Sequence, residues 1–135
     1  MANLGYIQIT RICNQECLFC SNPATGKMIN LKEAKKVVDD YIKLGYEGLI
    51  WTGGEPTLYP HLPELIKYAK SKNMPSRIIT NGQRISDYKY LKQLVDAGLN
   101  HVSVSLFSHK PKIQAFLTKK EDSLYLFYIY QLSYP

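Results

Sequence analysis

Residues 13–20 read Cys13-Asn-Gln-Glu-Cys17-Leu-Phe-Cys20, and they hold all three cysteines of the 135-residue chain. Three thiolates with this C-x3-C-x2-C spacing can hold three irons of a cubane cluster and leave the fourth iron open, although most iron–sulfur sites use four cysteines. A structural zinc site needs four ligands. A histidine would have to complete it, and the chain has three of them, at positions 61, 101 and 109. The stretch therefore predicts an iron–sulfur centre with one open position, and zinc is the alternative.

The spacing of Cys13, Cys17 and Cys20, with the aromatic Phe19 before the last cysteine, resembles the cluster motif of the radical S-adenosylmethionine (radical SAM) enzymes. The resemblance continues in order along the chain. Residues 52–56, Thr-Gly-Gly-Glu-Pro, are similar to the glycine-glycine-glutamate-proline motif of that family.

Two further stretches resemble strand ends of the same family. They are Thr80-Asn81-Gly82 and Val102-Ser-Val-Ser-Leu106. Each is weak alone, and Asn81 with Gly82 also has the composition of an ordinary turn. Together the motifs extend the resemblance over residues 5–110.

The resemblance implies two cofactors: a 4Fe-4S cluster held by Cys13, Cys17 and Cys20, and S-adenosylmethionine. In the family, one electron from the reduced cluster cleaves S-adenosylmethionine, and the 5′-deoxyadenosyl radical abstracts hydrogen from a substrate. The chain would then be an oxidoreductase, transferase or lyase whose substrate the sequence does not name. A one-electron donor such as a flavodoxin or ferredoxin is implied by this chemistry, and no catalytic side chain is assigned.

The residues expected to bind S-adenosylmethionine come from three places: Phe19 in the cysteine loop, Gly53, Gly54, Glu55 and Pro56, and Ser103 and Ser105. The glycines would allow close backbone approach, and the glutamate would orient the ammonium group of the ligand, directly or through neighbours. The aromatic ring would stack on adenine, and the serines would bond the ribose or the carboxylate.

Each of these assignments has a plainer alternative. Phe19 could anchor the core, and residues 53–56 could be a tight turn in which the proline fixes φ. The two serines could simply satisfy backbone groups.

The whole chain carries a formal charge of +6, with lysines scattered along expected helices. Without a compact basic patch or a recognisable motif, nucleic acid is an unlikely partner. The sequence shows neither a long apolar run nor a secretory signal, so we expect no membrane span and a cytoplasmic protein.

Hydrophobic periodicity predicts alternating strands and helices. Strands are expected at 5–10, 47–51, 77–80 and 101–106, with helices starting after Asn30, around 62–69 and around 91–95. Such βαβ units form a parallel sheet. The fold class is therefore α/β, a partial TIM-like (β/α) barrel with about four βα units, whereas the radical SAM core has six.

We expect one domain over residues 1–135, a partial radical SAM core, with an atypical tail at 121–135. Residues 124–135 contain no charged residue and are rich in aromatics, so they suggest a fragment or a broken reading frame; an amphipathic final helix is the alternative. A second function also stays open: an iron–sulfur protein that only transfers electrons, or an inactive remnant that binds a cluster.

Overall fold

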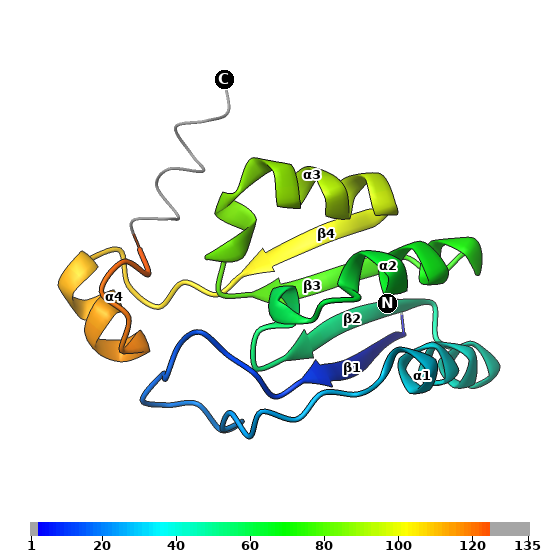
Figure 1. Ribbon diagram of the computed structural model, residues 1–135, viewed down its shortest axis with the longest axis horizontal. Coiled ribbons are helices and arrows are strands. Elements are labelled where there is room, and N and C mark those ends of the chain that lie inside the picture. Colours follow the sequence, from blue (N-terminus) through cyan, green and yellow to red (C-terminus); the bar gives the residue numbers. More distant parts are fainter. Residues whose placement is uncertain (1–2, 125–135) are drawn as a thin grey trace.

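Four parallel strands form the centre of this computed structural model, which describes residues 3–124 (Figure 1). The strands are β1 (Leu4–Thr10), β2 (Gly48–Gly53), β3 (Ser76–Thr80) and β4 (Leu99–Val104). They pair in the order β1-β2-β3-β4, so neighbours in sequence are neighbours in space. The predicted α/β class and its four parallel strands are confirmed.

A helix follows each strand. The helices are α1 (Leu31–Lys43), α2 (Leu62–Ser71), α3 (Tyr88–Ala97) and α4 (Pro111–Thr118), and short 3-10 turns occur at η1 (Pro56–Leu58) and η2 (Arg84–Ser86). Strand arrowheads, the long loop after β1 and α4 all lie on the same side of the molecule in Figure 1. This side is the carboxyl edge of the sheet, where parallel α/β folds place their sites.

Alternate side chains of the strands build the core. Ile7, Ile9, Trp51 and Ile78 are at most 3% exposed and pack with apolar residues of α1, α2 and α3. The indole of Trp51 is fully buried, as expected of a packing residue.

Alternation along the strand expected at 101–106 predicts that Val102, Val104 and Leu106 share one face and that Ser103 and Ser105 share the other. The structure follows this pattern only in part. Val102 and Val104 pack against the core, as expected for the helix-facing side of the sheet. The strand ends at Val104, however, and Leu106 is 41% exposed, so its predicted place on the valine face is wrong. The chain leaves the sheet there to reach α4.

Helix ends follow local side-chain chemistry. The side chain of Asn30 accepts a hydrogen bond from the backbone nitrogen of Glu33 at 2.9 Å, which caps α1. Gly45 and Gly98 have φ of +79° and +114° after α1 and α3, as expected of C-terminal glycines. The helix expected around 91–95 is α3, in which Leu91 and Leu94 are buried and Val95 is 54% exposed.

Sequence reasoning missed α4. Its apolar residues Ile113 and Phe116 are exposed, and Gln114 and Thr118 are the residues it buries, so its pattern differs from that of a core-facing helix. Most of the expected atypical tail, residues 125–135, lies outside the described residues.

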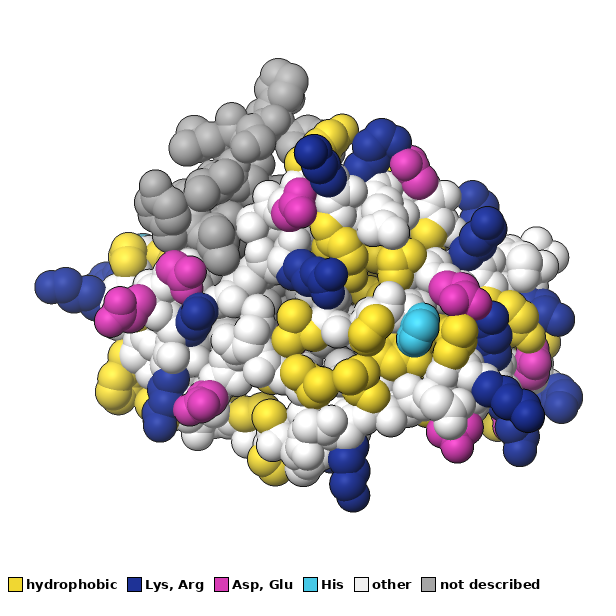
Figure 2. All heavy atoms as spheres, in the orientation of Figure 1, with side chains coloured by type: hydrophobic (Ala, Val, Ile, Leu, Met, Phe, Trp, Pro, Cys, Tyr) yellow, Lys and Arg dark blue, Asp and Glu magenta, His cyan; other side chains and the backbone are white. Residues whose placement is uncertain are grey.

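Lysine and arginine side chains are spread around the molecule on the face shown in Figure 2 rather than gathered into one patch. This distribution agrees with basic side chains on a solvated surface. The expectation that nucleic acid is not a partner stays a prediction. Within residues 3–124, no helix is long and apolar enough to cross a membrane.

We expect Asn30→Ala to lower the free energy of unfolding by about 1 kcal/mol, because it removes the α1 cap. Asn30→Asp keeps an acceptor at the same place and is the matched control, with stability close to that of the parent chain. Urea denaturation followed by circular dichroism measures both. Equal stability of Asn30→Ala and the parent would contradict the assigned cap.

Candidate functional site

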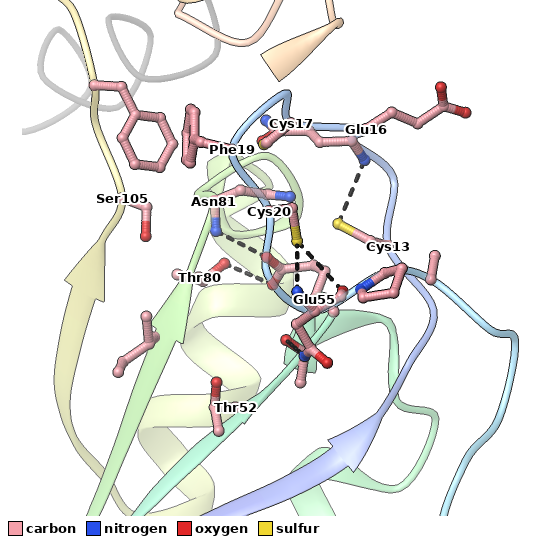
Figure 3. Close-up of a pocket in the computed structure, with 18 residues that line it drawn as sticks. Cys13, Glu16, Cys17, Phe19, Cys20, Thr52, Glu55, Thr80, Asn81 and Ser105 are labelled. Atoms are coloured by element: carbon pink, nitrogen blue, oxygen red, sulfur yellow. Dashed lines mark hydrogen bonds between the residues drawn. The ribbon is translucent and has the colours of Figure 1, made fainter. Parts of the chain in front are cut away.

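A cavity of about 520 Å³ opens at the carboxyl ends of the strands, a volume typical of small-molecule sites. Figure 3 shows side chains from the cysteine loop and from the ends of β2, β3 and β4 around it. The lining residues are Cys13, Gln15, Glu16, Cys17, Phe19, Cys20, Asn22, Pro23, Ala24, Thr52, Gly53, Gly54, Glu55, Ile79, Thr80, Asn81, Ser105 and Phe107. The cavity therefore unites segments that are far apart in sequence.

The loop between β1 and α1 forms one wall of the cavity and is held at its base. The guanidinium of Arg11 donates to the carbonyl of Pro23, with Nη2 at 2.9 Å, and the backbone nitrogen of Arg11 donates to Lys27 at 2.7 Å. A single antiparallel bridge joins Thr10 to Met28. These contacts close residues 11–27 into a loop whose ends lie side by side.

The end of β2 lies directly against this loop. The backbone nitrogens of Gly54 and Glu55 donate to the carbonyls of Thr10 and Ile12, each at 2.8 Å. A Cβ on Gly53 would overlap the Thr10 carbonyl, and one on Gly54 would overlap the Ile12 carbonyl and touch Cys13. Glycine is required at both positions because a neighbouring backbone occupies the space of a side chain.

Glu55 is 1% exposed, and its carboxylate is a hydrogen-bonding centre. Oε1 accepts from the Thr57 backbone nitrogen (3.1 Å), the Thr57 hydroxyl (2.6 Å) and the Thr80 hydroxyl (2.6 Å). Oε2 accepts from the Asn81 backbone nitrogen at 2.8 Å (Figure 3). The carboxylate thus joins the end of β2 to the end of β3, and these bonds compensate the cost of its burial.

A second layer supports this carboxylate. The Thr57 carbonyl accepts from the hydroxyl of Tyr90 at 3.0 Å and from the guanidinium of Arg84, which also lies 4.3 Å from the centre of the Tyr90 ring. Burial raises the pKa of Tyr90 to about 12, so its hydroxyl stays a donor at neutral pH. The η1 turn is therefore fixed from α3 and η2.

Helix α4 closes the far side of the loop. The backbone nitrogens of Glu16 and Leu18 donate to the carbonyls of Thr118 and Leu117, at 3.2 and 2.9 Å. Since the last carbonyls of a helix have no partner within it, the cysteine loop satisfies two of them.

Two aromatic rings meet at the mouth of the cavity. Phe19 and Phe107 have centroids 4.4 Å apart in an edge-to-face arrangement. Phe19 is 50% exposed, so the core-anchor interpretation is wrong. Gln114 of α4 holds the loop carrying Phe107, since its buried side chain accepts from the backbone nitrogens of Phe107 and Ser108 at 3.1 and 3.0 Å.

All three cysteines line the cavity, but their thiols are free. Burial raises the pKa of Cys13, and it also raises that of Cys17, with Cys13 adding to the effect. Metal binding would therefore have to release thiol protons. Within the described residues, no three His, Cys, Asp or Glu side chains are placed to hold a metal ion.

The structure brings most of the predicted site residues together. Phe19, Gly53, Gly54, Glu55 and Ser105 line the cavity with the cysteines, whereas Pro56 and Ser103 do not. Pro56 is buried at the start of η1, and Ser103 is half-buried within β4. No histidine is among the described lining residues, so the geometry places none as the fourth ligand of the zinc alternative.

Sequence reasoning missed several lining residues. Asn22 donates to the carbonyl of Gly53 at 3.1 Å, and Gln15, Asn81 and Phe107 also face the cavity. The position of Asn81 after a strand was the one available signal. The other three residues, Asn22, Gln15 and Phe107, lie in loops, and hydrophobic periodicity does not predict the path of a loop.

Comparison with known families matches residues 7–124 to the model described as the Radical SAM superfamily. The chain belongs to the radical SAM superfamily. The match extends past the sequence motifs to include α4, whose last turn holds the cysteine loop.

Its relatives within the superfamily are diverse. The chain is 38% identical over 102 residues to Fe-coproporphyrin III synthase of Methanosarcina barkeri, covering 73% of this chain and 25% of that protein. It is 36% identical over 110 residues to a probable GTP 3′,8-cyclase of Methanococcus maripaludis, covering 78% and 36%. It is 35% identical over 103 residues to PqqA peptide cyclase of Bradyrhizobium diazoefficiens, covering 73% and 27%. The chain thus spans about a quarter to a third of these relatives.

Solved structures show the same fold. SuiB of Streptococcus suis, bound to its precursor peptide SuiA, matches with a TM-score of 0.76 at 18% identity, over 98% of this chain and 31% of SuiB. TYW1 with a lysine-pyruvate adduct matches with a TM-score of 0.62 at 17% identity, over 91% and 48%. The four parallel strands and their helices therefore correspond to part of a radical SAM TIM-like core.

The superfamily implies a 4Fe-4S cluster and S-adenosylmethionine. Cysteine sulfur is the ligand type that iron–sulfur clusters use, and three cysteines line the cavity, although within the described residues they are not arranged around one metal position. A Cβ on Gly54 would overlap the Ile12 carbonyl, so the end of β2 packs closely on the loop that carries the cysteines.

We expect Gly54→Ala to lower the free energy of unfolding by about 1–3 kcal/mol, as over-packing of a buried site does, and to displace the cysteine loop. Alkylation of the cluster-free chain under anaerobic conditions should then modify Cys13 faster. Gly45→Ala, in open space at φ +79°, is the matched control. It should cost about 1 kcal/mol through backbone strain and leave alkylation unchanged. If Cys13 in Gly54→Ala is alkylated at the rate of the parent chain, the role of Gly54 in the close packing of β2 on the cysteine loop is contradicted.

Proposed function

We propose that the chain is a radical SAM enzyme domain in which Cys13, Cys17 and Cys20 hold a 4Fe-4S cluster and the cavity beside them binds S-adenosylmethionine. Held by these cysteines and reduced by an external donor, a cluster would supply the electron for reductive cleavage of S-adenosylmethionine to methionine and a 5′-deoxyadenosyl radical. The observation that carries the proposal is the packing of Gly53-Gly54-Glu55 against the cysteine loop at one cavity.

The charge of the cavity supports a cationic ligand. The chain has a net charge of +6, yet the described lining residues include Glu16 and Glu55 and no lysine, arginine or histidine. S-adenosylmethionine carries a sulfonium, an ammonium and a carboxylate, with a net charge of +1, so a lining without lysine, arginine or histidine and with the buried Glu55 suits its net positive charge.

Glu55 would orient the ammonium through the acceptor capacity that its own hydrogen bonds leave open. Its Oε1 accepts three hydrogen bonds and its Oε2 accepts one, from Asn81. Because each carboxylate oxygen has two lone pairs, Oε2 keeps one acceptor position. Phe19 and Phe107 offer apolar surface for the adenine, and Ser105 offers a hydroxyl for the polar part of the ligand.

The protein's own contribution is to orient the ligand and to restrict water, while the cofactors supply the difficult chemistry. The reaction substrate is undefined, because the relatives act on different molecules. A flavodoxin or ferredoxin is proposed as the electron donor, and a cytoplasmic location as its setting.

Anaerobic reconstitution of the chain with iron and sulfide tests the proposal. We expect a reduced cubane signal in electron paramagnetic resonance that changes when S-adenosylmethionine is added. The triple variant Cys13→Ala, Cys17→Ala, Cys20→Ala is the control and should give no such signal. A cubane signal that ignores S-adenosylmethionine would refute the cofactor pocket and leave a cluster-binding remnant or electron carrier.

Glu55→Gln is expected to keep the cluster and weaken S-adenosylmethionine binding roughly tenfold, since a hydrogen bond to a charged group contributes about 1.5–3 kcal/mol. The substitution preserves shape but leaves an amide facing the Asn81 nitrogen. Titration of the electron paramagnetic resonance change gives the affinity. Glu64→Gln on α2, which removes an ion pair with Lys35 of α1, is the matched control. Parental affinity in Glu55→Gln would exclude the role assigned to this carboxylate.

A further inference from the structure

Three amide side chains at the edge of the cavity form a closed ring of hydrogen bonds. The backbone nitrogen of Gln83 donates to Asn81 Oδ1 (3.1 Å), Asn81 Nδ2 donates to Asn14 Oδ1 (2.7 Å), and Asn14 Nδ2 donates to Gln83 Oε1 (2.8 Å). Asn14 belongs to the cysteine loop, and the other two follow β3, so the ring spans 67 positions of sequence between Asn14 and Asn81.

The direction of every bond in the ring is fixed. A backbone nitrogen can only donate, so the Asn81 atom facing Gln83 is an oxygen and its amide nitrogen faces Asn14. The Asn14 oxygen must then accept, and its nitrogen must donate to Gln83. Since no amide can flip without losing a bond, the ring holds one arrangement of its three side chains.

The ring joins the two halves of the proposed cofactor site. Asn14 is bonded covalently to Cys13, and the Asn81 backbone nitrogen donates to Glu55 Oε2 at 2.8 Å (Figure 3). Gln83 is 8% exposed, and its Nε2 is buried with no partner among the described residues, so this amide is held by its oxygen alone. A tight connection therefore runs from the first cysteine to the buried carboxylate.

We propose that Asn14, Asn81 and Gln83 are positioning residues that set the cysteine loop relative to Glu55, so that cluster and S-adenosylmethionine meet in one geometry. The proposal rests on the proposed function. Neither Asn14 nor Gln83 lines the cavity, so both act through the residues they hold. Loss of the ring should change how the cluster responds to S-adenosylmethionine without removing a cysteine.

A double-mutant cycle on the cluster-free chain tests whether the ring exists as a unit. The effects of Asn14→Ala and Asn81→Ala on stability should be non-additive. The unfolding equilibrium constant of the double variant should differ roughly fivefold from the value obtained by multiplying the effects of the two single variants. Asn100→Ala is the matched control, because its side chain accepts from Ser76 at the opposite edge of the sheet at 2.9 Å. Combined with Asn14→Ala, it should be additive. Additivity of Asn14 and Asn81 would overturn the proposal, whatever cofactor the chain binds.

Reconstituted protein tests the positioning role. Asn14→Ala should load iron as the parent does, need roughly tenfold more S-adenosylmethionine for the electron paramagnetic resonance change, and show altered g values in that complex; a tenfold loss corresponds to about 1.4 kcal/mol of binding free energy. Asn100→Ala should match the parent. If Asn14→Ala keeps the affinity and the g values of the parent chain, the ring has only a structural role and the positioning role is overturned. If the parent itself shows no response to S-adenosylmethionine, the proposed function fails, while the cycle still reports on the ring.

Discussion

The buried carboxylate of Glu55 is the interaction on which the site depends. A charge at 1% exposure is tolerated only when donors surround it, and here the donors come from Thr57, Thr80 and Asn81. Because these residues follow two different strands, satisfying one carboxylate fixes the relative positions of both strand ends. Gly54 and Glu55, at the end of β2, donate two backbone hydrogen bonds to the start of the cysteine loop, so the position of this loop is fixed as well.

The strands and first three helices could be predicted because their signals are local. The side chain of Asn30 caps α1 within three residues of itself, alternation along β1 places Ile7 and Ile9 in the core, and the short apolar run of β2 places Trp51 there. Helix α4 could not be predicted in this way. Its start, Lys110, makes no side-chain cap, and it buries polar Gln114 because that amide binds the backbone of Phe107 and Ser108.

Only part of the candidate site could be predicted from the sequence, because many of its contacts join residues that are far apart in the chain. The cysteine spacing and the paired glycines are short-range patterns, and they located one wall of the cavity each. Contacts such as Asn22 to the Gly53 carbonyl or Asn14 to Asn81 join residues 31 and 67 positions apart. A spacing of that size has no period, and asparagine in a loop is common for other reasons.

The net charge of the chain does not predict the charge of the site either. The chain is basic, yet its lysines lie mostly on the outside, and the described lining of the cavity includes the buried Glu55 and no lysine, arginine or histidine. Electrostatics at short range depends on the groups that face a ligand, not on the sum over the surface.

The two glycines explain why the cysteine motif and the glycine-glycine-glutamate motif belong together. At Gly53 the backbone conformation, with φ of +157°, already favours glycine. At Gly54 no such conformation occurs, and glycine is required because a Cβ would overlap the Ile12 carbonyl of the cysteine loop. The reverse also holds, since the loop at residues 10–12 finds its backbone partners in Gly54 and Glu55. Each motif therefore constrains the other across the 32 residues that separate Cys20 from Gly53.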